Sequence, residues 1–380
     1  MKTKSIDIIG AGIGGLTTAI ALSQKEIQIR IFEQAKAFKT VGAGIILANN
    51  AMQVFEKLGL REEIASCGNP ISAMHITRAS LKPISSIDLS YFERKHKVQN
   101  IAIHRGKLQD ILLNHLDKKI IKTGYELSSV EENPTGFKLR FNNGESTYSD
   151  YLLGADGLNS VVRNSLFAEN KTRNAFQVCW RGVTDFELPE QYQNELNEAW
   201  GKGDRFGFVQ IAPQKVYWYA LKTLKTEKSD YAMERLAEYF KSYHPIIRNI
   251  IETTPFYKIH AAEISDLSPI KNWYKGKVCL LGDAAHATTP NMGQGACQAI
   301  EDAYVLSECM QQYEWDEAFA KYQKLRKPKA HEVVKTSWTL GKIAHWENPL
   351  AIFMRNQLMK MTPKRLNRKQ SERIFQLDFL

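Results

Sequence analysis

Three glycines near the start of the chain have the spacing of a loop that binds a pyrophosphate. Gly10, Gly12 and Gly15 form a GxGxxG pattern directly after the apolar run at 5–9. Gly10 permits a tight turn, Gly12 lets the backbone approach phosphate oxygens, and Gly15 lets a helix pack closely on a strand. Free N–H groups at the start of that helix would point at the phosphates. The pattern therefore predicts dinucleotide binding.

The elements around these glycines must hold the loop at the edge of a parallel sheet. We expect a buried strand over 5–9, a helix over 16–24 and a second strand over 27–32. Glu33 follows that second strand, near the usual spacing for a carboxylate that binds ribose hydroxyls. A carboxylate there disfavours a 2′-phosphate, so the resident cofactor is not expected to be NADP. The alternative interpretation is a glycine-rich turn with no ligand.

A second signature lies far along the chain, in VCLLGDAAHATTPNMGQG at 278–295. Gly282 and Asp283 follow an expected strand at 278–281, which would place a carboxylate near the polar chain of a cofactor. A helix is expected to begin within Gly293-Gln294-Gly295, and its N-terminus would direct positive charge at a ligand. A flavin suits that position, because reduced flavin carries negative charge. The two signatures together predict FAD. The alternative for Asp283 is a helix N-cap. For His286, an ordinary turn or capping residue is weighed against a catalytic role.

These motifs resemble those of the single-component, FAD-dependent aromatic hydroxylases, the group A flavoprotein monooxygenases. LLGADGLNSVVR at 152–163 looks like that family's DG motif, and the resemblance assigns Asp156 to the pyrophosphate region and to NAD(P)H use; a structural Asp156–Arg163 ion pair is the alternative. HRGKLQDIL at 104–112 and VGAGI at 41–45 resemble segments that contact FAD and line the flavin ring. The expected FAD-binding residues are Gly10, Gly12, Gly14, Gly15, Glu33, Gly44, Ile45, Arg105, Asp156, Gly282, Asp283, Gly293, Gln294 and Gly295.

The resemblance implies a reaction as well as a cofactor. NAD(P)H would bind transiently and reduce the flavin, and O2 would then give a C4a-hydroperoxyflavin that hydroxylates a small aromatic or heteroaromatic compound. No second GxGxxG pattern occurs, so no separate domain for NADPH is expected. Catalytic support is assigned to the flavin-facing residues Pro290, Gly293 and Gly295. Two alternatives stay open: hydroxylation or epoxidation of a lipophilic polyene, isoprenoid or polycyclic natural product, and a non-catalytic flavin-binding redox sensor.

The expected fold is α/β, with a Rossmann-like FAD-binding domain, an inserted mixed β-sheet substrate domain and C-terminal helices. The expected FAD-binding parts are 1–70, 100–170 and 272–320; the substrate domain comprises 71–99 and 171–271; the basic helices comprise 321–380. Within the insert, 175–186, 205–212 and 215–223 have strand composition. By alternation, Tyr217 and Tyr219 share one face of a strand and Val216 and Trp218 the other. The substrate-binding candidates are Arg181, Gln210, Tyr217, Tyr219, Asn291 and Met292.

Composition limits the remaining functions. The chain has 380 residues, 43% of them hydrophobic, which is enough for a sizeable core, and no apolar run is long enough to span a membrane. Five cysteines without CxxC spacing predict reduced thiols, a cytoplasmic location and no metal site.

Positive charge is concentrated at the end of the chain. Residues 321–380 contain 14 Lys and Arg against 4 Asp and Glu, an excess equal to the whole-chain net charge of +10. We expect helices over 315–334 and 335–345, then an apolar and basic segment after Pro349. This region is interpreted as a solvated helix pair or, alternatively, as a surface for acidic lipid or an anionic partner. Nucleic acid is not expected, because no binding motif accompanies the charge.

Overall fold

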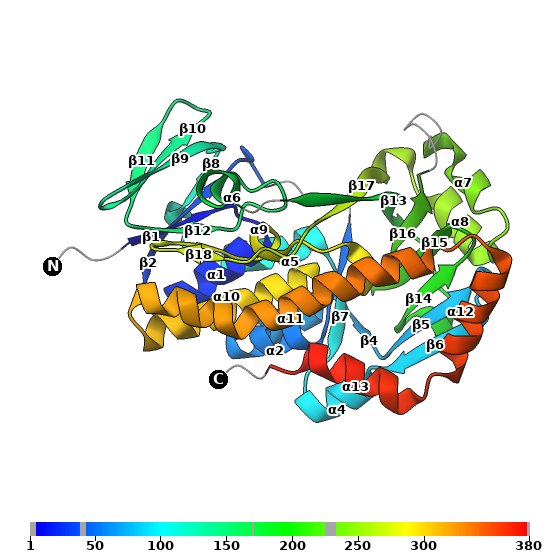
Figure 1. The fold of residues 1–380 in the computed structure, drawn as a ribbon. Helices are drawn as coiled ribbons and strands as arrows, with labels where there is room; N and C mark the ends of the chain where they lie inside the picture. The colour runs from blue at the N-terminus through cyan, green and yellow to red at the C-terminus, as the bar shows by residue number, and fades with distance from the viewer. Residues whose placement is uncertain (1–4, 39–42, 169–170, 225–232, 378–380) are drawn as a thin grey trace.

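The computed structural model describes residues 5–38, 43–168, 171–224 and 233–377. Two large sheets lie at opposite ends of the molecule, and the long helix α11 (Trp315–Ala344) runs past both (Figure 1). Within these ranges, every helix is too short or too polar to form a membrane span.

A six-stranded sheet contains the glycine loop at its carboxyl edge. Its order is β18-β19-β12-β1-β2-β8, and all neighbours are parallel except β18 and β19. The central strand β1 is almost fully buried, as a strand with both faces covered must be. Three of its five residues are isoleucine, and its buried Asp7 pairs with Arg30 at 2.7 Å. The bounds are β1 (Ser5–Ile9), β2 (Gln28–Glu33), β8 (Ile121–Thr123), β12 (Tyr151–Gly154), β18 (Tyr274–Lys275) and β19 (Val278–Leu280).

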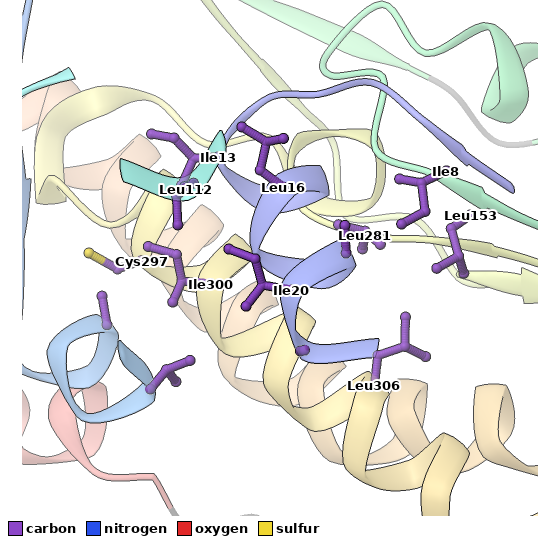
Figure 2. Close-up of a cluster of buried hydrophobic side chains, with 14 of the residues drawn as sticks. Ile8, Ile13, Leu16, Ile20, Leu112, Leu153, Leu281, Cys297, Ile300 and Leu306 are labelled. Atoms are coloured by element: carbon purple, nitrogen blue, oxygen red, sulfur yellow. The ribbon is translucent and has the colours of Figure 1, made fainter. Parts of the chain in front are cut away.

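Helices cover one face of this sheet. α1 (Ile13–Ser23) packs against α10 (Gly295–Gln312), and Figure 2 shows Ile20 of α1 close to Ile300 of α10. A three-stranded antiparallel sheet lies on the other side, formed by β9 (Leu127–Asn133), β10 (Gly136–Phe141) and β11 (Ser146–Ser149) (Figure 1).

A seven-stranded mixed sheet forms the other end of the molecule, in the order β17-β13-β16-β15-β14-β5-β6. One of its faces packs against α7 (Leu236–Tyr239) and α8 (Pro245–Thr253) in a separate hydrophobic cluster. The strands are β5 (Ala73–Arg78), β6 (Pro83–Asp88), β13 (Thr172–Asp185), β14 (Glu195–Trp200), β15 (Asp204–Ala212), β16 (Lys215–Thr223) and β17 (His260–Leu267).

A small antiparallel sheet lies between the two large ones. It has the order β3-β7-β4, with β3 (Gly44–Leu47), β4 (Asn69–Ile71) and β7 (Asn100–His104). The remaining α-helices are α2 (Asn49–Lys57), α3 (Arg61–Cys67), α4 (Ser90–His96), α5 (Arg105–Asn114), α6 (Val161–Leu166), α9 (Asp283–His286), α12 (Pro349–Met361) and α13 (Lys364–Phe375).

Two expectations about helices need correction. The first helix begins at Ile13 rather than 16, because extended Gly12 serves as its N-cap and the helix starts inside the glycine loop. The predicted break between 334 and 335 is wrong, since α11 is continuous from Trp315 to Ala344 and even contains Pro328. Buried positions from Arg326 to Gly341 continue along it, so tertiary packing holds the helix together.

Candidate functional site

The glycine loop has one position at which the protein itself does not require glycine. A Cβ on Gly10 would lie 2.5 Å from the Ala155 carbonyl oxygen, and one on Gly15 would lie 2.0 Å from the Gly10 oxygen. A Cβ on Gly12 would meet no protein atom within 4 Å. Packing therefore explains Gly10 and Gly15, whereas Gly12 leaves the N-terminus of α1 open to a close external ligand. Gly14 faces Ala299 of α10, with 3.1 Å between its ideal Cβ and that of Ala299.

Glu33 lies at the end of β2, beside this loop. Its two carboxylate oxygens accept hydrogen bonds from the backbone N–H groups of Ala11 and Ala35, both at 2.8 Å. The glycine loop thus fixes the position of the carboxylate. Each oxygen keeps a further lone pair, so the carboxylate can also accept from ribose hydroxyls.

The DG segment follows β12, next to β1. One Asp156 oxygen accepts the Val162 N–H at 3.1 Å, while Oδ1 is buried without a partner among the described residues. Desolvation raises the pKa of Asp156, and the nearby Ser160 hydroxyl and the Val162 N–H oppose that shift. Burying a carboxylate oxygen without a hydrogen-bond partner destabilises the folded protein. This oxygen is therefore available to accept a hydrogen bond from a ligand.

Arg163 joins the DG segment to the distal signature. Its guanidinium donates to the carbonyl oxygens of Ala284 at 2.9 Å and Leu158 at 2.5 Å. These bonds go to backbone rather than to Asp156. The DG segment and the distal signature are therefore physically connected, although they lie far apart in the sequence.

The Gly282-Asp283 turn is held from behind by a buried ionic network. Gly282 donates its N–H to Asp302 at 2.9 Å, and His286 Nε2 lies 2.5 Å from the same carboxylate oxygen. Arg326 contacts the other Asp302 oxygen at 2.8 Å and also pairs with Glu301. His286 is almost fully buried in this network, where its bond to Asp302 helps to hold the turn.

Asp283 faces away from that network. Its side chain is exposed to solvent, yet desolvation raises its pKa, opposed by the charges of His286 and Arg105. A Cβ on Gly295, the first residue of α10, would be 3.9 Å from Asp283 Oδ1. Asp283 and the α10 N-terminus thus border the same space.

The loop before α10 turns sharply at Gly293, which has a φ of +62°. Pro290 begins a short 3-10 turn and is exposed, as is Gly293. Gln294 is buried and its side-chain oxygen accepts from Asn50 at 3.0 Å and from Gln298 at 3.1 Å. Gln294 therefore orients the helix start, and the exposed backbone around Gly293 faces outward.

Tyr217 connects this region to the seven-stranded sheet. A Cβ on Gly44 would lie 2.4 Å from Cγ of the Tyr217 ring, so β3 and β16 are in direct contact there. Burial raises the pKa of both Tyr217 and Asp283, and the charge of Arg105, at the start of α5, is close enough to each to oppose that shift. Ile45 is half-buried on β3 beside Gly44; the Val41 and Gly42 positions of the predicted VGAGI segment lie outside the described residues.

The predicted alternation on β16 is confirmed. Val216 and Trp218 lie in the cluster under α7 and α8, whereas Tyr217 and Tyr219 pack on the other side with ring centroids 6.0 Å apart. Arg181 of β13 pairs directly with Tyr219 and shares its face. Among the described residues, only its Nε has a hydrogen-bond contact, 3.3 Å to Cys179 Sγ, so both Nη groups are free of protein partners.

The structure does not bring every substrate candidate to this face. Gln210 pairs with Val216, on the opposite face from Tyr217, and donates to Asn69 at 3.2 Å. The Asn291 amide is occupied by protein groups: it accepts from Arg205 and donates to Thr289 and Ser337 at 2.8 Å. Met292 is half-buried beside it.

Sequence reasoning missed a polar cluster on the same sheet face as Tyr219. The Glu198 carboxylate accepts from the Tyr219 hydroxyl, from Arg205 at 3.0 Å and from Trp200 Nε1 at 2.6 Å. Arg205 is 1% exposed and also donates to Asn291, which links the cluster to the loop before α10. The only available signal was alternation on β14 and β15, which places Glu198 and Arg205 on the Tyr219 face.

These features fit the adenosine, pyrophosphate and ring of a flavin dinucleotide. The open Gly12 backbone, the available Asp156 oxygen, and Asp283 beside the α10 N-terminus lie along one edge, at the carboxyl ends of parallel strands. Ligands bind at this edge in open α/β sheets.

Comparison with known proteins agrees with this geometry. The family model described as "FAD binding domain" matches residues 2–337. The chain is 39% identical to aurachin C monooxygenase/isomerase of Stigmatella aurantiaca, with 95% of each chain covered. It is 30% identical to 2-heptyl-3-hydroxy-4(1H)-quinolone synthase of Pseudomonas aeruginosa, with 97% of each covered. Klebsiella pneumoniae HpxO complexed with FAD and uric acid has a TM-score of 0.88 and 26% identity, covering 98% of this chain and 96% of that one. The predicted α/β class with a Rossmann-like nucleotide-binding part is confirmed.

Proposed function

Since the chain belongs to the FAD binding domain family and is an FAD-dependent monooxygenase, we propose that it hydroxylates a 4-quinolone-like heteroaromatic ring carrying a lipophilic substituent. NAD(P)H and O2 are the proposed co-substrates. The resemblance inferred from the sequence is confirmed, and with it the enzymatic over the non-catalytic hypothesis. The proposed substrate combines the heteroaromatic ring of the leading hypothesis with the lipophilic character of its alternative.

The name of a relative that aligns over 97% of both chains supports the substrate class. By its name, this Pseudomonas aeruginosa enzyme makes a 4(1H)-quinolone with a heptyl chain at carbon 2 and a hydroxyl at carbon 3. Carbon 3 of such a ring is electron-rich, because the ring nitrogen donates density toward it through the enaminone system. An electrophilic oxygen donor attacks a carbon of this kind without a catalytic base on the protein.

The contact between Tyr217 and Gly44 is the observation that carries the proposal. It joins the sheet face of Arg181 and Tyr219 to the segment that resembles the flavin-lining stretch. We propose that the free Nη groups of Arg181 donate to the ring carbonyl, and that Tyr217 and Tyr219 pack against the ring. Apolar residues of the same face, including Val209 and Leu196, would accept the lipophilic substituent.

When bound, FAD would accept reducing equivalents from NAD(P)H and would then activate O2. The protein orients the substrate, excludes water and places the positive end of α10 near the ring. We propose that Pro290, Gly293 and Gly295 provide this flavin-facing backbone, and that 71–99 and 171–271 form the substrate-binding part against the FAD-binding part of 1–70, 100–170 and 272–320.

Anaerobic stopped-flow measurement of flavin reduction tests the substrate class. FAD-loaded protein is mixed with NADH or NADPH in the presence of 2-heptyl-4(1H)-quinolone, quinolone without the chain, urate or salicylate. We expect the alkylquinolone to accelerate flavin bleaching most, because the chain supplies binding energy. Faster reduction with urate or salicylate, and none with either quinolone, would overturn the proposed substrate.

A further inference from the structure

Helix α12 packs against the protein with its polar side. Arg355 is 3% exposed and donates to the carbonyl oxygens of Ile343 at 3.1 Å and Ala344 at 3.0 Å, which lie at the end of α11. Its guanidinium also lies over the Trp200 ring, 4.9 Å from the centroid. Asn356 beside it is buried as well. Polar residues thus attach α12 to the molecule, the reverse of the usual arrangement for a surface helix.

The outer side of α12 carries large apolar residues instead. Leu350, Phe353, Met354, Leu358 and Met361 are 51–78% exposed. Their spacing of three and four residues places them on one face of the helix. Together with Trp346 and Leu366, which flank the helix and are 41% and 57% exposed, they are called the apolar stripe. The stripe holds seven of the eleven exposed large hydrophobics in the described part of the chain, and such a concentration marks an interaction surface.

Positive charge borders the apolar stripe. Lys360, near the end of α12, is exposed, and α13 exposes Arg365, Arg368, Lys369 and Arg373. Glu372 is the single acidic residue within the bounds of α12 and α13, and it pairs with Lys95. The border is therefore cationic at all physiological pH values.

We propose that α12 and the first turns of α13 bind an anionic lipid bilayer. The apolar stripe enters the boundary between headgroups and acyl chains, and the bordering cations contact lipid phosphates. Several features favour lipid over a protein partner. The stripe runs along the outer side of a helix, its Leu, Met and Phe side chains adapt to a fluid phase, and the charge excess complements an anionic surface. Binding is peripheral, with α12 lying in the plane of the interface.

With α12 in the plane of the interface, the end of the molecule that is proposed to bind substrate would lie near the bilayer. α12 packs beside β6, the edge strand of the seven-stranded sheet. A lipophilic compound dissolved in the bilayer would thus be held near that sheet. Vesicle binding itself requires neither turnover nor a particular substrate, so the membrane proposal and the proposed reaction fail independently.

Vesicle cosedimentation of the FAD-loaded protein, followed by flavin absorbance in the pellet, tests the proposal. We expect binding to vesicles of phosphatidylcholine mixed with phosphatidylglycerol, weaker binding at high salt, and little binding to phosphatidylcholine alone. The double variant Phe353→Ser/Leu358→Ser should lower the partition coefficient roughly tenfold or more, since each side chain loses apolar burial. The matched control Phe256→Ser/Tyr257→Ser removes two aromatic residues exposed by 54% and 78% elsewhere and should bind as the wild type does.

Variants that remove positive charge separate the electrostatic contribution to vesicle binding from the apolar one. Lys360→Gln/Arg365→Gln should weaken binding roughly fivefold per charge at low salt, whereas the exposed pair Lys118→Gln/Lys119→Gln should not. All four variants alter exposed side chains, so flavin absorbance and the thermal midpoint should stay unchanged. The proposal is overturned if the wild type remains in the supernatant with anionic vesicles, or if both controls lose as much binding as the test variants. It is also overturned if ultracentrifugation finds a dimer that Phe353→Ser/Leu358→Ser dissociates while vesicles bind nothing.

Discussion

Gly44 and Tyr217 are in such close contact that a methyl group on residue 44 would lie 2.4 Å from Cγ of the tyrosine ring. No adjustment of a flexible chain end relieves this contact, because the ring is 9% exposed and packed within the core. The small sheet and the seven-stranded sheet therefore meet at a fixed distance. This contact sets the position of the proposed substrate face relative to the segment expected to line the flavin.

Replacing Gly44 tests whether that distance matters for turnover. Gly44→Ala should displace the Tyr217 ring and lower kcat/KM by up to about 100-fold, since small misplacements of reacting groups are costly. Adding Tyr217→Ala should relieve the clash, so the double variant should lose less than the sum of the two single losses. Strict additivity in kcat/KM would show that the contact has no functional role.

Gly12 and Gly15 provide a matched pair that separates ligand binding from packing. Gly12→Ala meets no protein atom, so the apoprotein should unfold at the wild-type temperature while FAD affinity falls about tenfold or more. Gly15→Ala places a Cβ 2.0 Å from the Gly10 oxygen and should destabilise the apoprotein itself, by roughly 1–3 kcal/mol. Thermal unfolding and flavin-fluorescence titration measure the two effects. Equal FAD affinity in Gly12→Ala and wild type would contradict the assignment of this loop.

The raised pKa of Asp156 predicts a pH dependence of apoprotein stability. Burial makes the folded protein bind a proton at Asp156 more tightly than the unfolded chain does. Stability from this group therefore decreases as the pH rises from the ordinary Asp pKa through the raised value, and stays lower above it. Asp156→Asn removes this titration while its oxygen still accepts the Val162 N–H. The thermal midpoint of the Asp156→Asn apoprotein should exceed that of the wild type most near neutral pH, and the difference should shrink toward pH 4. A difference that does not change with pH would show that ionisation of Asp156 does not lower the stability.

Arg181 should affect substrate binding without affecting the flavin. Arg181→Gln removes a charged donor whose Nη groups make no hydrogen bond to a described residue, so we expect kcat/KM for the alkylquinolone to fall roughly 10- to 100-fold. The FAD dissociation constant should not change. Arg248→Gln, on an exposed turn of α8, is the control. An unchanged KM and kcat in Arg181→Gln would remove Arg181 from the substrate site.

Much of the fold was predictable because local rules and tertiary packing agree there. The glycine loop, the strands at 5–9 and 278–280, and the alternation on β16 follow directly from residue type and spacing. The structure also places Asp283 beside the start of α10. Features that depend on contacts between distant parts of the chain could not be predicted from residue type and spacing. The Glu198–Arg205 pair requires knowing which strands are neighbours, and the continuity of α11 through Pro328 depends on burial along its length.

α12 shows why composition alone was ambiguous. Its mixture of apolar and basic residues predicted either a solvated pair of helices or a binding surface. Which side faces inward is decided by Arg355, whose bonds to the end of α11 turn the apolar side outward. No periodicity in the sequence indicates this, since an amphipathic pattern normally implies the opposite orientation.

The central claim is oxygen transfer from O2 to a lipophilic 4-quinolone by the FAD-loaded enzyme. Turnover of 2-heptyl-4(1H)-quinolone with NAD(P)H under 18O2, analysed by mass spectrometry, tests it most directly. The account predicts one labelled oxygen in the quinolone product for each NAD(P)H consumed. Label appearing only in hydrogen peroxide, with the quinolone recovered unchanged under either nicotinamide, would contradict it.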